Sequence, residues 1–140
     1  MASPLFFQQS GTGTPLLLIH GLMATGEMFE PVLPALANRY RVIVPDLRGH
    51  GRSGALPEPY TVEQLANDLA QLLDELHINA VHILGYSQGG AVAQQFAHDY
   101  PARVHGLVLA CTYAYNMLSA RERLEGILSP WLVRFLGVRR

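Results

Sequence analysis

The stretch Ile83-Leu84-Gly85-Tyr86-Ser87-Gln88-Gly89 carries the strongest structural signal in this chain. Its apolar start predicts a buried strand, and Gly-x-Ser-x-Gly followed by small residues predicts a sharp turn into a helix. Such a turn, the nucleophile elbow, lifts a serine hydroxyl off the top of a sheet. We expect glycine to be required two positions either side of the serine, because a side chain there would collide with the neighbouring strand and helix. The first N–H groups of the helix point to where an oxyanion would form.

The composition indicates one globular domain without a strongly charged surface. The chain has 140 residues, of which 49% are apolar, and 10 basic residues balance 11 acidic ones, so nothing in the charge indicates a nucleic-acid partner. No apolar run reaches the ~20 residues of a membrane span and no signal peptide is evident, so we expect a cytoplasmic protein. The single cysteine, Cys111, excludes an internal disulfide and is expected to be a buried small hydrophobe.

Short apolar segments alternate with helical patterns along the chain. This order is typical of a mostly parallel sheet with helices on both faces. The expected parallel strands are continuous apolar runs, as in sheets that are covered on both sides. They lie at residues 16–19, 42–44, 81–84 and 106–110, and an antiparallel strand is expected before them at residues 5–9.

The helices are predicted from capping and periodicity. Thr61 and Gln64 form the capping-box pattern, and a long amphipathic helix with apolar residues at 3.6-residue spacing follows it. A weaker helix, interrupted by prolines, is expected at residues 28–36. Small residues at the start of the helix expected at 89–98 would allow it to pack closely on the preceding strand.

Three motifs follow the first three expected parallel strands in order. His20-Gly21-Leu22-Met23 comes after the first, the segment from Asp46 to Ser53 (Asp-Leu-Arg-Gly-His-Gly-Arg-Ser) after the second, and the nucleophile elbow after the third. Loops that follow parallel strands emerge on the same edge of the sheet, where ligands bind. The three motifs are therefore expected to meet at one site.

This combination resembles the α/β-hydrolase superfamily, in the group with a His-Gly loop and an Asp-x-Arg-Gly-His-Gly-x-Ser loop. The resemblance covers nearly the whole chain. It implies that Ser87 is the nucleophile and that the backbone N–H groups of Leu22 and Gln88 form the oxyanion hole, with Met23 as the alternative to Leu22. It also implies that His20 organises its loop and is not the catalytic base.

The resemblance has further implications for the loops, the substrate and the domains. Asp46, Arg48 and His50 would be structural, with an Asp–Arg pair stiffening their loop. A serine nucleophile implies cleavage of an ester, lactone, thioester or related acyl bond in a small molecule, without cofactor or metal. Residues 1–116 would be the N-terminal part of the hydrolase core, and residues 117–140 the beginning of a helical cap. A membrane-surface helix is the alternative for this basic, amphipathic segment.

The catalytic triad is expected to be incomplete. A serine nucleophile needs a general base and an orienting acid, and in this fold the order along the chain is Ser, Asp or Glu, then His. The histidines after Ser87 are His98, ~16 Å along the helix at 1.5 Å per residue, and His105, at the opposite edge of the sheet. His77 and His82 are expected near that distal edge, and neither His20 nor His50 is placed as the family's base is.

The sheet is also expected to lack the C-terminal strands that carry the triad acid and histidine. Residues 106–110 would then form an exposed apolar edge. Two hypotheses follow. In the first, the chain is the N-terminal half of a serine hydrolase and is inactive alone. In the second, it is a non-catalytic binding or assembly module that another chain completes.

Overall fold

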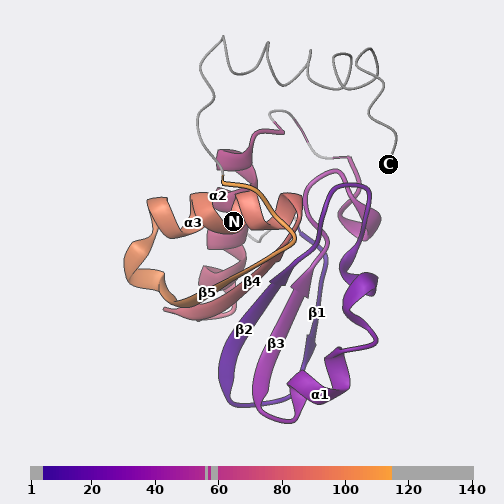
Figure 1. The fold of residues 1–140 in the computed structure, drawn as a ribbon, viewed down its shortest axis with the longest axis vertical. Coiled ribbons are helices and arrows are strands. Elements are labelled where there is room, and N and C mark those ends of the chain that lie inside the picture. The colour runs from indigo at the N-terminus through magenta and orange to yellow at the C-terminus, as the bar shows by residue number, and fades with distance from the viewer. Residues whose placement is uncertain (1–4, 56, 58–59, 115–140) are drawn as a thin grey trace, which may run out of the picture.

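The computed structural model describes residues 5–55, 57 and 60–114, which form one sheet with helices on both faces (Figure 1). The strand order is β1-β3-β2-β4-β5. β1 runs antiparallel to β3, and the other neighbours are parallel, as the sequence predicts. The strands are β1 (Phe7–Ser10), β2 (Thr14–Ile19), β3 (Tyr40–Pro45), β4 (Val81–Tyr86) and β5 (Val104–Ala110).

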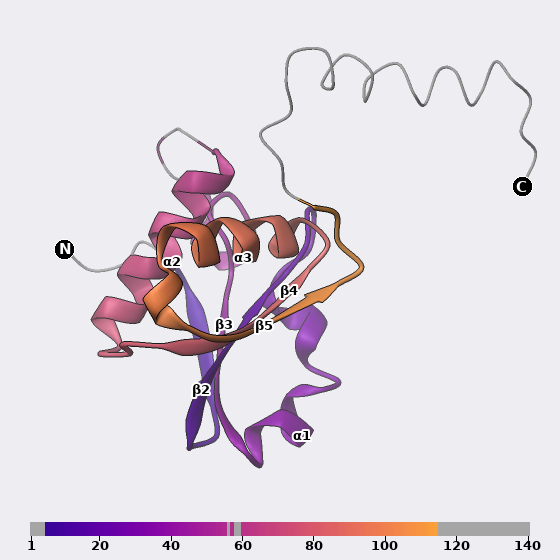
Figure 2. The ribbon, with the colours of Figure 1, turned by 60° about the vertical axis from the view of Figure 1, so that its left-hand side comes forward.

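The helices divide between the two faces of the sheet. α2 and α3 lie on one face, and the short helices η1 and α1 lie on the other, as Figure 2 shows. The elements are η1 (Gly26–Phe29), α1 (Leu33–Ala37), η2 (Gly51–Ser53), α2 (Val62–Glu75), α3 (Gln88–Asp99) and η3 (Pro101–Arg103). The weak helix expected at 28–36 is therefore a 3-10 turn followed by a single α-helical turn. Pro34 falls at the start of α1, where its missing N–H breaks no helical hydrogen bond.

The larger apolar core lies between the sheet and the α2–α3 layer, and holds fully buried side chains of β2, β3, β4 and both helices. α2 begins as predicted: the Thr61 hydroxyl accepts the Gln64 N–H at 3.2 Å. The Gln64 side chain, however, extends along the helix and donates to Asp68 Oδ1 at 2.9 Å. The Thr61 cap is therefore confirmed, whereas the hydrogen bond seen for the Gln64 side chain goes forward to the buried Asp68 carboxylate and not back to Thr61.

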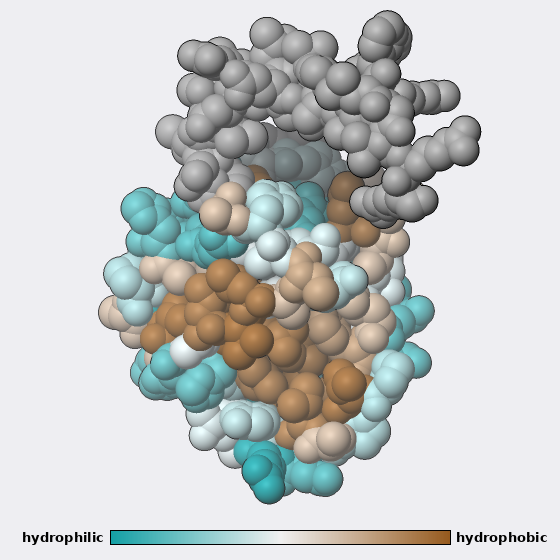
Figure 3. All heavy atoms as spheres, viewed as in Figure 1, coloured by the Kyte–Doolittle hydropathy of each residue, from teal (hydrophilic) through white to brown (hydrophobic). Residues whose placement is uncertain are grey.

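β5 is an apolar strand at the end of the sheet. Leu107, Val108 and Leu109 are 36%, 55% and 43% exposed, and since successive side chains point to opposite faces, both faces of β5 are partly exposed. Figure 3 shows apolar surface over the region where Figure 1 draws β5, β4 and β2. The predicted exposed apolar edge is confirmed for the described part of the chain.

Cys111 corrects the prediction of a buried thiol. It is exposed and has a φ of 49°, because it makes the turn that leaves the edge strand β5. The expected amphipathic segment 117–140, its cap assignment and the domain boundary at 116/117 lie outside the described residues. No helix within the described residues is long and apolar enough to cross a bilayer.

We expect the bare β5 edge to drive self-association. Val108→Thr keeps a β-branched side chain while making this exposed surface polar, so aggregation should slow and the free energy of unfolding should change by less than about 0.5 kcal/mol. Light scattering at matched concentration and urea unfolding measure the two effects. As a control, Val42→Thr changes a fully buried valine and should lower the free energy of unfolding by roughly 1–3 kcal/mol. Unchanged aggregation of the Val108 variant would contradict the prediction.

Candidate active site

Ser87 alone makes the turn between β4 and α3. β4 ends at Tyr86, α3 begins at Gln88, and Ser87 has φ 52° and ψ −118°. Few residues with a Cβ adopt a positive φ, and those that do so outside ordinary turns concentrate at functional sites. The Ser87 side chain does not cap the helix that follows it. The predicted strand–turn–helix therefore places at the carboxyl end of β4 a serine hydroxyl that is not used to cap α3.

The glycines around Ser87 are required by backbone contact. A Cβ at Gly85 would lie 2.5 Å from the Gly89 carbonyl oxygen, and a Cβ at Gly89 would lie 2.5 Å from the His20 carbonyl oxygen. Backbone atoms cannot rotate out of the way as a side chain can, so only glycine fits at both positions. A Cβ at Gly21 would lie 3.1 Å from the Ser87 Cβ, so the loop after β2 rests directly against the serine.

The two predicted oxyanion donors belong to segments that flank Ser87. Leu22 follows the glycine that touches Ser87, and Gln88 follows Ser87 itself. The turn around Leu22 is closed by the Ala24 N–H, which donates to the Gly21 carbonyl oxygen at 3.3 Å. Leu22 is 63% exposed, and Met23, the alternative donor, is 93% exposed with a φ of 58°. In the loop after β2, the Leu22 and Met23 side chains are therefore exposed, while Gly21 lies against the serine turn.

His20 joins the loop after β2 to the loop after β3. Its ring is buried, with Nδ1 donating to the Gly21 carbonyl oxygen at 2.8 Å and Nε2 accepting the Leu47 N–H at 2.9 Å. A ring that donates at one nitrogen and accepts at the other is neutral. Burial lowers the pKa of His20 below its ordinary value of 6.5, against the hydrogen bond to Gly21. Because both ring nitrogens are engaged, His20 is not available as a base.

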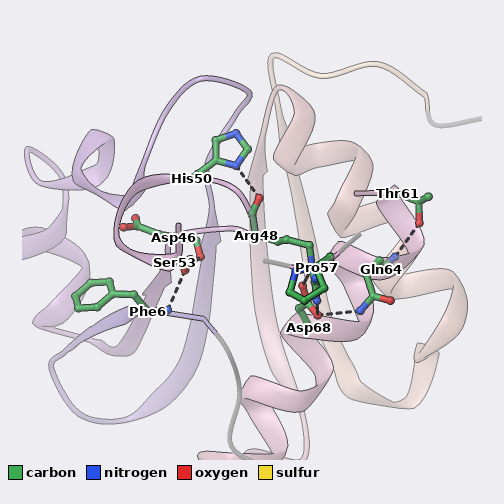
Figure 4. Close-up of polar contacts among 9 residues, drawn as sticks. All are labelled: Phe6, Asp46, Arg48, His50, Ser53, Pro57, Thr61, Gln64 and Asp68. Atoms are coloured by element: carbon green, nitrogen blue, oxygen red, sulfur yellow. Dashed lines mark hydrogen bonds and ion pairs between the residues drawn. The ribbon is translucent and has the colours of Figure 1, made fainter. Parts of the chain in front are cut away.

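Asp46 holds the loop after β3 against η1. Its Oδ1 accepts the Gly26 N–H at 2.8 Å, and its Oδ2 accepts the Arg52 N–H at 2.9 Å. Burial raises the pKa of Asp46, but these backbone hydrogen bonds and the charge of Arg52 outweigh it and leave the pKa below its ordinary value. The Ser53 hydroxyl closes the loop by donating to the Asp46 carbonyl oxygen and accepting the Phe6 N–H (Figure 4).

Arg48 forms a buried ion pair with α2. Its Nε and Nη2 lie 2.6 and 2.7 Å from the two Asp68 carboxylate oxygens, and its Nη1 donates to the Pro57 carbonyl oxygen (Figure 4). The expectation of an Asp–Arg pair within the 46–53 loop is therefore wrong for Arg48: its carboxylate is 20 positions along the chain. Sequence reasoning missed Asp68, although one signal was present. Asp68 is the only acid on the buried face of α2, where the other buried residues are apolar.

Within the described residues, none of the remaining histidines hydrogen-bonds to Ser87. His50 donates through Nδ1 to the Arg48 carbonyl oxygen at 3.0 Å, with its ring 5.1 Å from that of His20. His82 and His105 lie together near the starts of β4 and β5, at the end of the sheet opposite Ser87, with ring centroids 5.4 Å apart. His98 is in the last turn of α3.

Within the described residues, no histidine or carboxylate hydrogen-bonds to the Ser87 hydroxyl, and no three potential metal ligands gather anywhere. The residue after Ser87 has an unpaired polar atom: the buried Gln88 Oε1 accepts no hydrogen bond from any described residue. As far as residues 5–55, 57 and 60–114 show it, the site therefore contains a serine, its turn and its supporting loops, without a base or an acid bound to the serine.

Comparison with known proteins agrees with this geometry. The family model described as "alpha/beta hydrolase fold" matches residues 14–136. The chain belongs to the α/β-hydrolase family. The sequence-based prediction of this family and of its fold is therefore confirmed.

Characterised relatives of this α/β-hydrolase chain are about twice as long. The magnesium-chelatase 30 kDa subunit of Rhodobacter capsulatus is 40% identical over 127 residues, which make up 89% of this chain and 42% of that protein. The pimeloyl-[acyl-carrier protein] methyl ester esterase of Aeromonas hydrophila is 37% identical over 129 residues, 91% of this chain and 48% of that protein. Among solved structures, a thermophilic esterase from Thermogutta terrifontis is 37% identical, with a TM-score of 0.78. The match covers 93% of this chain and 48% of the esterase chain.

The Arg48–Asp68 pair is expected to stabilise the fold strongly once formed. Asp68→Asn would leave a buried guanidinium without its counter-charge and should lower the free energy of unfolding by roughly 3–5 kcal/mol. As a matched control, Asp74→Asn removes the largely exposed partner of Arg103 and should cost less than about 1 kcal/mol. Urea unfolding of the two variants checks this, and equal losses would contradict it.

The neutral, buried His20 should make stability fall in mild acid. Below about pH 6.5 the unfolded chain binds a proton at this histidine that the folded chain does not, so the free energy of unfolding should decrease as pH falls toward the lowered pKa of folded His20. Unfolding curves between pH 7.5 and pH 5 should show a smaller loss in His20→Gln. His98→Gln, at an exposed histidine, controls for loss of an imidazole, and an identical pH dependence in both variants would refute the prediction.

Proposed function

We propose that this α/β-hydrolase chain carries the nucleophile and the oxyanion hole of a serine hydrolase that cleaves an ester, lactone, thioester or related acyl bond of a small molecule. The observation that carries the proposal is the Ser87 turn, with its positive φ and its hydroxyl free of helix capping. Two similar proteins, a methyl ester esterase and a thermophilic esterase, support an acyl substrate.

In the proposed reaction, Ser87 Oγ attacks the substrate carbonyl carbon while its proton passes to a general base. The negative charge that develops on the carbonyl oxygen is held by the N–H groups of Gln88 and Leu22, and the N-terminus of α3 adds to this stabilisation. When the tetrahedral intermediate collapses, the acyl–oxygen or acyl–sulfur bond breaks and the leaving group takes up the proton. Water then cleaves the Ser87 ester by the same steps and releases the acid.

We infer that the base and its orienting acid come from outside the described residues. The two ring nitrogens of His20 are committed to backbone groups, and the other described histidines do not meet Ser87. The chain also spans about half the length of the relatives that it matches. We therefore propose that the 140-residue chain alone does not hydrolyse acyl substrates.

A non-catalytic binding or assembly module, completed by another chain, is the second candidate. The observation that favours it is the partly exposed apolar strand β5, which presents both faces and one edge to a partner. One similar protein is named as a subunit of a magnesium chelatase, which is in keeping with a role in an assembly. In this case Ser87 would not react with acyl substrates in any context.

Labelling with a fluorophosphonate tests the proposal. The 140-residue chain alone should be labelled no more than its Ser87→Ala variant, because no base activates the hydroxyl. A hybrid should supply the base: in it the full chain is followed by the part of the Thermogutta terrifontis esterase beyond the matched region. We expect the hybrid to be labelled at Ser87 and to hydrolyse p-nitrophenyl esters at a rate that Ser87→Ala reduces by ~10³-fold or more.

Each result decides one part of the proposal. Labelling and ester turnover by the chain alone, lost in Ser87→Ala, would overturn the claim that it is inactive. A hybrid that unfolds cooperatively but is not labelled at Ser87 would overturn the serine nucleophile and favour the binding module.

A further inference from the structure

The peptide groups on both sides of Ser87 are anchored by residues at and after the end of β5. The Ser87 N–H donates to the Ala110 carbonyl oxygen at 3.0 Å. The Ser87 carbonyl oxygen accepts two hydrogen bonds, one from the Gly90 N–H at 2.9 Å and one from the Thr112 hydroxyl at 2.6 Å. The Thr112 bond is the side-chain contact in this set, and it comes from a residue 25 positions along the chain.

The bond from Thr112 fixes the direction of a second group. In a trans peptide the carbonyl oxygen and the following N–H point in opposite directions. Holding the Ser87 carbonyl therefore also sets the direction of the Gln88 N–H, which is the oxyanion donor in the proposed function. The ψ angle of Ser87, −118°, is the rotation that turns this peptide. A hydrogen bond to the carbonyl also polarises the peptide and strengthens its N–H as a donor.

The surrounding residues make room for this contact and hold it. A Cβ at Gly90 would lie 2.5 Å from the Thr112 Cβ and Oγ1, so glycine is needed there for the hydroxyl to reach Ser87. Cys111, with its φ of 49°, turns the chain so that Thr112 faces α3. The next residue is fastened to the same helix, because the Gln94 side-chain amide donates to the Tyr113 carbonyl oxygen at 2.8 Å.

We propose that Thr112 is a positioning residue of the oxyanion hole. Its hydroxyl orients and polarises the Ser87–Gln88 peptide, so that the Gln88 N–H faces the carbonyl oxygen of the substrate. Thr112 acts through this peptide and does not touch the substrate. The catalytic meaning of the arrangement rests on the proposed function of Ser87, whereas the orientation of the peptide does not.

The orientation is tested by NMR on the full 140-residue chain, where no activity is needed. Thr112→Val removes the hydroxyl at constant shape and should shift the Ser87 carbonyl ¹³C and Gln88 amide resonances. Thr112→Ser should restore them, and Gly90→Ala, which displaces Thr112, should shift them as Thr112→Val does. Thr14→Val, at an exposed threonine where β2 begins, is the control and should leave them unchanged. Wild-type resonances in Thr112→Val would overturn the proposal.

The catalytic consequence is tested by ester hydrolysis in the hybrid described above. Thr112→Val should lower kcat about tenfold or more with little change in KM, because an oxyanion donor acts mainly in the transition state. Thr112→Ser should recover most of the rate, which a general packing defect would not allow. An unchanged kcat in Thr112→Val would overturn the positioning role. If the hybrid instead keeps its full rate in Ser87→Ala, the proposed nucleophile fails, while the NMR result still decides the orientation of the peptide.

Discussion

The backbones of β2, β4 and α3 approach each other around Ser87 more closely than side chains would permit. Gly85 and Gly89 occupy the two positions where a Cβ would overlap neighbouring backbone atoms. This close approach allows a single residue to reverse the chain between β4 and α3, and it forces that residue to a positive φ. The orientation of the serine and of the first helical N–H groups therefore depends on contacts between main-chain atoms, which do not relax as side chains do.

The loops beside the turn are held by buried polar groups as well as by the apolar packing of Leu47 in the core. His20 ties the loop after β2 to the loop after β3, Asp46 ties the latter to η1, and Arg48 ties it to α2. Buried polar groups are costly when unpaired, so each of these contacts favours one loop conformation strongly over its alternatives. The result is a rigid support at the edge of the sheet where Ser87 lies.

In contrast to these buried loops, β5 is partly exposed to solvent. Among the described strands it is the most exposed, yet residues at and just after its C-terminal end, Ala110 and Thr112, make the hydrogen bonds that hold the Ser87 peptide groups. A strand that is partly exposed on both faces gains less stability from burial than the inner strands do. A change in the position of this end of β5 would therefore also change the geometry of the Ser87 turn.

The amino-acid sequence by itself determined the order of strands and helices, the turn at Ser87 and the need for Gly85 and Gly89. These features follow from local apolar periodicity, from the Thr61 cap and from a motif whose spacing reflects one tight turn. The tertiary structure alone decided that Arg48 pairs with Asp68, that Cys111 is exposed and that Thr112 binds the Ser87 carbonyl. The physical reason is distance along the chain: the partners of Arg48 and Thr112 are 20 and 25 positions away, and only the packed sheet and helices bring them together.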